Sequence, residues 1–130
     1  NGVPIAEYMA HMAENLYVMC QIESVEATAN AEAIARVDGV DALVVGPNDL
    51  AGSMGIPGQF ENPKHVAAMD AILAAGHRAG KPVATVPHGS HDTASLFKRG
   101  FDCIIASTEY TLMRRAAAAE IADARKAMGN

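Results

Sequence analysis

The segment LVVGPNDLAGSMG, residues 43–55, decides how the chain is organised. Its apolar start, Leu43–Val45, is typical of a buried strand, and the Gly-Pro-Asn-Asp that follows is typical of a turn. Glycine then recurs at Gly52 and Gly55. A buried strand therefore ends by presenting one carboxylate, Asp49, in a glycine-rich loop. The function of that carboxylate is the first question that the sequence raises.

Apolar, β-branched runs alternate along the chain with segments of helical spacing. We expect strands over Tyr17–Ile22, Ala42–Gly46, Pro82–Val86 and Asp102–Ala106. We expect helices over Ile5–Asn15, Ala27–Val37, Pro63–Ala79, His91–Arg99 and Thr111–Met128. Asn62 is a good cap for the third helix, and Pro63 suits its first turn.

Strands separated by helices predict right-handed crossovers and a parallel sheet, hence an α/β fold. The nearly continuous apolar runs are expected of strands that are covered on both faces. Two architectures fit: a small open doubly wound sheet, or half of an eight-stranded (β/α) barrel. In both, functional side chains lie at the carboxyl ends of strands, where we place Glu23, Asp49, His88 and Ser107.

Composition limits the classes of function. The 130-residue chain has a formal net charge of −5 and no Lys/Arg run, which disfavours nucleic acid as a partner. No apolar run approaches the roughly 20 residues that a membrane helix needs. Cys20 and Cys103 lie in apolar runs, so we expect two buried thiols in a reducing cytoplasm. The chain starts without Met, and we expect it to be a piece of a longer protein.

Two carboxylates follow neighbouring strands. Gln21 and Glu23 point to the same side of the first strand because side chains alternate. Parallel neighbours lie about 4.8 Å apart, so Glu23 and Asp49 could reach one ion. Mg²⁺ is often held by one or two carboxylates, with water and substrate in the remaining positions. The alternative is that both acids are only helix caps or surface groups.

The histidines and glycines allow more than one interpretation. His88 and His91 have HxxH spacing, but we favour His88 as a substrate contact over metal binding by the pair. His11, His65 and His77 fall on predicted helices, where we expect surface positions. The glycines after Asp49 either permit tight turns or let the backbone approach an anion. No Walker sequence is present.

The motifs QIES, residues 21–24, and GVDALVVGPNDLAGSMG, residues 39–55, resemble the class II pyruvate aldolases of the HpcH/HpaI family. That family includes 4-hydroxy-2-oxoheptanedioate aldolase and 2-keto-3-deoxy-L-rhamnonate aldolase and belongs to the phosphoenolpyruvate/pyruvate superfamily. The resemblance implies a (β/α)8 TIM barrel. The four strands expected here match the fifth to the eighth, which is the C-terminal half.

The resemblance also implies roles for individual residues. Glu23 and Asp49 would bind Mg²⁺, Mn²⁺ or Co²⁺, and Gln21 would be a catalytic residue beside the metal. The backbone of Pro47, Asn48 and Asp49 would help to hold the carboxylate of a 2-oxo acid. The implied reaction cleaves a 4-hydroxy-2-oxo acid to pyruvate and an aldehyde through a metal-stabilised enolate.

The chain departs from the family's pattern in one respect. The family's catalytic Arg and His lie in the first half of the barrel, on strands that this chain does not contain. We therefore expect a single domain over residues 1–130 that pairs with the missing N-terminal half-barrel or with a second copy. A homo-oligomer would use the terminal helix, 111–128. Two alternatives stay open: a citryl- or malyl-CoA lyase-like enzyme, and a catalytically silent half-barrel fragment.

Overall fold

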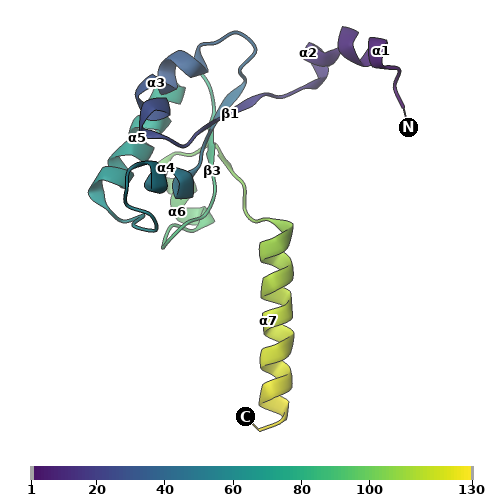
Figure 1. The fold of residues 1–130 in the computed structure, drawn as a ribbon, viewed down its shortest axis with the longest axis vertical. Coiled ribbons are helices and arrows are strands. Elements are labelled where there is room, and N and C mark those ends of the chain that lie inside the picture. Colours follow the sequence, from purple (N-terminus) through teal and green to yellow (C-terminus); the bar gives the residue numbers. More distant parts are fainter. Residues whose placement is uncertain (1, 130) are drawn as a thin grey trace.

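A computed structural model describes residues 2–129 of the chain, in which a parallel sheet alternates with helices (Figure 1). The strands are β1 (Met19–Ile22), β2 (Ala42–Val45), β3 (Val83–Thr85) and β4 (Cys103–Ile104). Their order in the sheet is β1-β2-β3-β4, the same as in the sequence. The expected α/β class with four parallel strands is thereby confirmed.

The register of the sheet brings the carboxyl ends of the strands to one edge. Met19 pairs with Ala42, Leu43 with Val83, and Ala84 with Cys103. The residues that follow the strands therefore gather at one end of the sheet, as in other parallel α/β folds.

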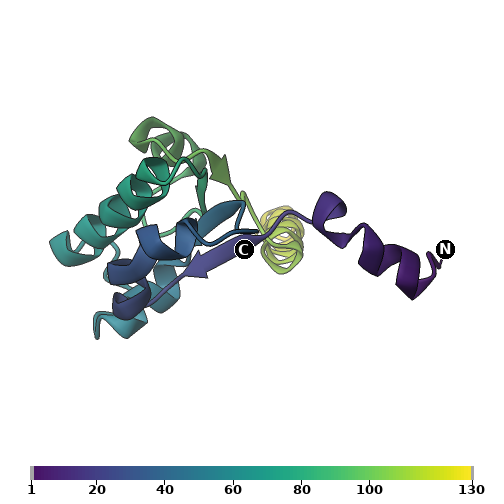
Figure 2. The same cartoon turned by 90° about the horizontal axis from the view of Figure 1, so that it is seen from above.

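The helices α3 (Val25–Ala35), α5 (Pro63–Arg78) and α6 (Thr93–Arg99) pack on one face of the sheet (Figure 2). Their apolar side chains meet those of the strands in one core. The larger members of this core are Ile22, Leu43, Val45, Leu50, Met69, Ile72, Val83, Leu96 and Phe101. The core thus fixes the strand ends on which the candidate site is built.

The helix ends follow the capping signals of the sequence. The Asn62 side chain accepts a hydrogen bond from the backbone N–H of Lys64 at 3.1 Å and begins α5. Asp92 caps α6 in the same way, and Gly100 ends α6 with a φ of 109°. That left-handed conformation is the one that favours glycine. Asp92, and not His91, marks the start of the helix.

Two helical segments differ from the expectation. The segment expected as one helix over Ile5–Asn15 forms α1 (Ile5–Ala10) and α2 (Met12–Asn15), which are separated at His11. The segment expected as a glycine-rich loop forms the helix α4 (Pro47–Ser53), with Asp49 in its first turn. Proline at the first helical position is a start signal, and here it outweighs the glycines.

The last helix, α7 (Glu109–Ala127), extends away from the sheet (Figure 1). It buries none of its residues against the rest of the chain. Its exposed apolar side chains are Tyr110, Leu112, Met113 and Ile121. No helix among residues 2–129 is long and apolar enough to span a membrane.

Part of the sheet is open to solvent. All residues of β3 are buried, but Gln21 on β1 and Cys103 on β4 are exposed. The expectation of two covered faces is therefore wrong for these strands, because α3, α5 and α6 cover only one face of the sheet. The expectation that both thiols are buried is wrong for Cys103, whereas Cys20 is half-buried.

Candidate metal centre

Gln21 and Glu23 meet at the carboxyl end of β1. The Gln21 amide Nε2 donates a hydrogen bond to Glu23 Oε2 at 2.5 Å. Glu23 does not cap the helix that follows, because that role belongs to Ser24, whose Oγ accepts from the N–H of Ala27 at 3.0 Å. The half-buried Glu23 carboxylate is therefore oriented by Gln21 and keeps acceptor positions for another ligand.

Asp49 follows the end of β2 and is exposed in the first turn of α4. The N-cap position of that helix is Gly46, whose own N–H donates to the carbonyl of Ile22 at 3.1 Å. An acid in the first turn often reaches back to the N-cap N–H, but here that donor has a different partner. Within residues 2–129 the Asp49 carboxylate has no hydrogen bond or ion pair.

Gly46 lets the two strand ends approach closely. A Cβ atom at this position would lie 2.9 Å from Gln21 Nε2 and 3.0 Å from Glu23 Oε2. Real Cβ atoms rarely come so close to other atoms, so only glycine leaves this space open. The backbone that leads into α4 therefore runs directly against the Gln21–Glu23 pair.

This donor set fits a hard divalent cation. Glu23 follows β1, and Asp49 lies in the first turn of α4, after the adjacent strand β2. Both carry carboxylate oxygens, and Mg²⁺-type ions commonly use one or two carboxylates together with water. A closed zinc site needs about four protein ligands. Among residues 2–129 no group of three or more His, Cys, Asp or Glu side chains is arranged to hold a metal. Glu23 and Asp49 are therefore the candidate ligands, and their carboxylates are of the kind that an open oxygen site uses.

His65 holds the beginning of α4, and the expectation that it lies on the surface is wrong. It is fully buried, with Nε2 at 3.0 Å from the carbonyl oxygen of Pro47 and Nδ1 at 3.2 Å from that of Phe60. The sequence carries a signal that could have placed it correctly. His65, Met69 and Ile72 are four and three positions apart, which puts them on the same apolar face of a helix. His11 and His77 are exposed, as expected.

His88 is also buried, with 7% of its surface exposed. Its ring lies against Phe60, His65 and His91, with ring centroids 4.9 to 5.9 Å away. Nδ1 lies 2.8 Å from the carbonyl oxygen of Val86, and Nε2 has no partner among residues 2–129. Burial lowers the pKa of His88 below its ordinary value, mainly because the charged form loses hydration.

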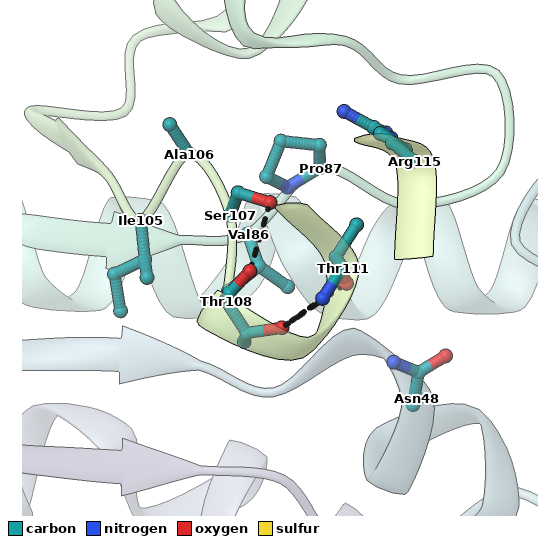
Figure 3. A pocket seen from close by; sticks show the side chains of 9 residues that line it. All are labelled: Asn48, Val86, Pro87, Ile105, Ala106, Ser107, Thr108, Thr111 and Arg115. Carbon is teal, nitrogen blue, oxygen red and sulfur yellow. Dashed lines mark hydrogen bonds between the residues drawn. The ribbon is translucent and has the colours of Figure 1, made fainter. Parts of the chain in front are cut away.

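A cavity of about 240 Å³ opens at the carboxyl ends of β3 and β4 (Figure 3). Asn48 from α4 lines one side, and Thr111 and Arg115 from α7 line another. Ser107, which was expected at a strand end, also lines it. Asn48 precedes Asp49 on α4, but neither Asp49 nor Glu23 lines the cavity.

Comparison with known proteins shows the family of the chain. Residues 5–116 match the family model described as HpcH/HpaI aldolase/citrate lyase. The chain belongs to the HpcH/HpaI aldolase/citrate lyase family.

Curated members of this family are similar over most of the chain. It is 37% identical over 113 residues to a hydroxypyruvate/pyruvate aldolase of Chromohalobacter salexigens, covering 87% of this chain and 44% of the relative. It is 31% identical over 122 residues to a 5-keto-4-deoxy-D-glucarate aldolase of Klebsiella pneumoniae, covering 94% and 47%. The chain thus spans about half the length of the curated relatives that it matches.

A solved HpcH/HpaI aldolase from Desulfitobacterium hafniense superposes with a TM-score of 0.78 at 26% identity. The superposition covers 96% of this chain and 49% of that structure. The sheet and its helices therefore correspond to about half of an HpcH/HpaI aldolase fold, and the open doubly wound alternative is set aside.

Proposed function

We propose that this chain supplies the metal-binding part of a divalent-metal-dependent aldolase. Such an enzyme would cleave a 4-hydroxy-2-oxo acid to pyruvate and an aldehyde. The observation that carries the proposal is the close approach at Gly46, which brings the start of α4 against the Gln21–Glu23 pair. Membership of the HpcH/HpaI family supports the same reaction class.

Each residue of the candidate centre has a role in the proposal. Glu23 and Asp49 would hold Mg²⁺, Mn²⁺ or Co²⁺, and Gln21 would keep the Glu23 carboxylate in position through its hydrogen bond. When bound, the cation would stabilise negative charge that develops on the keto oxygen of the substrate. The backbone around Pro47 and Asn48 would bind the substrate carboxylate. His65 keeps this backbone in position through its contact with the carbonyl oxygen of Pro47.

His88 would contact the substrate as a neutral side chain. Its lowered pKa keeps the imidazole uncharged near neutral pH. The contact between Nδ1 and the Val86 carbonyl places the proton on Nδ1. Nε2 is then an acceptor, but the atom is buried in the described structure, so a hydrogen bond from a substrate hydroxyl group would require the neighbouring side chains to move.

The complete activity requires more of the barrel than this chain contains. β1 and β4 each pair on one side only within the described residues, and α7 is uncovered. Unpaired strand edges tend to add further strands. We infer that a complementary half-barrel or a second copy completes the sheet, and that α7 makes contacts between subunits of a cytoplasmic homo-oligomer.

The test is a Mn²⁺ titration of the purified chain, with and without pyruvate. We expect binding that pyruvate tightens, and we expect Glu23→Gln and Asp49→Asn each to abolish it. Glu26→Gln is the matched control, because the substitution removes the same charge from an exposed position at the start of α3. Equal binding by the wild type, Glu23→Gln and Asp49→Asn would contradict the assignment of the centre.

Turnover separates the aldolase from a catalytically silent fragment. Release of pyruvate from a 4-hydroxy-2-oxo acid, measured with the chain alone and after addition of its complementary half, should require both parts. Metal binding without turnover under either condition would favour the silent fragment.

A further inference from the structure

The chain folds back on itself shortly after β3, in the turn 88–91. The N–H of His88 donates to the carbonyl oxygen of His91 at 3.1 Å, and the N–H of His91 donates to that of His88 at 2.8 Å. Gly89, inside the turn, has a φ of 53°, in the left-handed region that favours glycine. The turn is therefore a small unit that is closed by its own backbone hydrogen bonds.

Glu61, from the segment between α4 and α5, holds this turn from outside. Ser90 Oγ donates to Glu61 Oε1 at 2.6 Å, and the N–H of Ser90 donates to the same oxygen at 3.4 Å. His91 Nε2 lies 3.2 Å from Glu61 Oε2, close enough for an ion pair when the imidazole is protonated, although the geometry is not that of a hydrogen bond. The bonds from Ser90 lower the pKa of Glu61 below its ordinary value. One charged carboxylate thus ties two residues of the turn.

Phe60, next to Glu61, packs directly against the turn. Its ring centroid lies 5.4 Å from that of His88. A Cβ atom at Gly89 would lie 3.0 Å from Phe60 Cδ2 and 3.2 Å from Glu61 Oε1. Phe60 is itself held from α5, because its carbonyl oxygen lies 3.2 Å from His65 Nδ1. The segment that carries Phe60 and Glu61 is therefore a firm support for the turn.

The closed turn leaves one polar atom of His88 without a partner. His88 Nε2 is buried and has no hydrogen bond within residues 2–129, whereas Nδ1 lies 2.8 Å from the carbonyl oxygen of Val86. Buried polar atoms are nearly always hydrogen-bonded in native proteins, and an unpaired one costs free energy. Because His88 belongs to the turn and its ring packs against Phe60 and His65, movement of the turn away from Phe60 opens the space around the ring.

We propose that Glu61 is a latch that holds the turn 88–91 closed, and that release of the turn exposes His88 Nε2 to a hydroxyl group of a ligand. Glu61 is a positioning residue, because it acts on His88 through Ser90 and His91. The identity of the ligand as a 4-hydroxy-2-oxo acid rests on the proposed function. The latch itself needs neither the metal centre nor a substrate.

The experiment measures how fast diethyl pyrocarbonate modifies each histidine of the full chain, by mass spectrometry of its peptides. The reagent acylates neutral imidazole nitrogens that it can reach, and the reaction is run at pH 7.5 without metal or substrate. In the wild type we expect His88 to react much more slowly than the exposed His11. Glu61→Ala should raise the rate at His88 by about tenfold, because a charge-assisted hydrogen bond no longer favours the closed state. Ser90→Ala, which keeps the contact between His91 and Glu61, should raise it by a smaller factor.

Two controls separate local opening from general loss of stability. His65 is fully buried beside His88, with both ring nitrogens against backbone carbonyls, so its rate reports unfolding of the whole chain. Glu26→Ala removes an exposed carboxylate from α3 and should leave the rate at His88 unchanged. A rise at His88 alone would support the latch. An unchanged rate at His88 in Glu61→Ala, or an equal rise at His88 and His65, would overturn it.

A second arm tests the ligand separately. The reaction is repeated on Glu61→Ala with Mn²⁺ and 4-hydroxy-2-oxopentanoate, a small member of the proposed substrate class. We expect the ligand to slow the modification of His88 again and to leave that of His11 unchanged. Without such protection the proposed substrate contact of His88 is overturned, while a rise at His88 in the first arm still supports the latch.

Discussion

Gly46→Ala tests the geometry of the candidate centre with a single methyl group. The backbone of Gly46 has φ −94° and ψ 90°, a conformation open to alanine, so the change strains no dihedral angle. The added carbon would lie 2.9 Å from Gln21 Nε2 and 3.0 Å from both Cβ and Oε2 of Glu23. The Gln21 amide and the Glu23 carboxylate must therefore move, while the strand pairing stays in place.

The expected effects on stability and on binding differ in size. Inserting a methylene into a packed site costs about 1–3 kcal/mol. Replacing glycine by alanine in a compatible conformation raises the free energy of unfolding by about 0.4–1 kcal/mol, because the unfolded chain loses conformational freedom. We expect a net loss of about 1–2 kcal/mol in the free energy of unfolding. Misplacing a ligand and its orienting group costs roughly 10–100-fold in metal affinity, so Mn²⁺ binding should fall by at least about tenfold.

Mn²⁺ binding is measured by electron paramagnetic resonance, and stability by urea unfolding of the same preparations. Gly52→Ala is the matched control, since Gly52 lies on α4 and an added Cβ would meet no atom within 4 Å. It should keep wild-type affinity and gain up to about 1 kcal/mol from helix propensity. The reasoning is refuted if folded Gly46→Ala binds Mn²⁺ like the wild type.

Three further expectations concern the packing around the centre. His65→Leu should lower the free energy of unfolding by about 1–3 kcal/mol, because a buried hydrogen-bonding group is lost. Urea unfolding measures this loss beside the control His11→Leu, which changes an exposed histidine. A loss no larger than that of the control would contradict the prediction. Gly76→Ala should lower the free energy of unfolding by about 1–3 kcal/mol, despite the better helix propensity of alanine, because the added Cβ would collide with Val83 Cγ2. An unchanged urea midpoint would contradict this and show that α5 can shift. The pKa of His88 is lower in the folded state than in the unfolded state. The neutral His88 side chain therefore contributes to stability above the unfolded-state pKa, and this contribution is lost as the pH falls. The free energy of unfolding then decreases by at most about 1.4 kcal/mol per pH unit. Urea midpoints at pH 7.5 and 5.5 should therefore differ less in His88→Gln than in the wild type, and equal differences would refute the role of burial.

The α/β order and the ends of most helices could be predicted from the sequence because local chemistry determines them. Asn62 and Pro63 begin α5, and Gly100 ends α6, as their cap and turn preferences dictate. Leu43 and Val45 are buried, as the apolar run of β2 predicted.

Other features depend on long-range packing that no short pattern reveals. α4 was missed because Gly52 and the Pro-Asn-Asp sequence resemble a loop, and the helix is held from outside by His65. The close approach at Gly46 joins residues from two strands, so a single window of sequence does not show it. The roles of Glu23 and Asp49 remain predictions.

The order of the strands has a consequence for how the chain folds during synthesis. Because β1, β2, β3 and β4 are adjacent in the order in which they are made, each new strand finds its partner already present. Pairing of Leu43 with Val83 encloses the longest segment, which contains α4 and α5. Closing a long loop costs more conformational entropy than closing a short one. Docking of β3 onto β2 is therefore expected to be the slowest pairing step in a nascent chain. Until α5 has been synthesised and covers β2, the apolar side of β2 stays exposed.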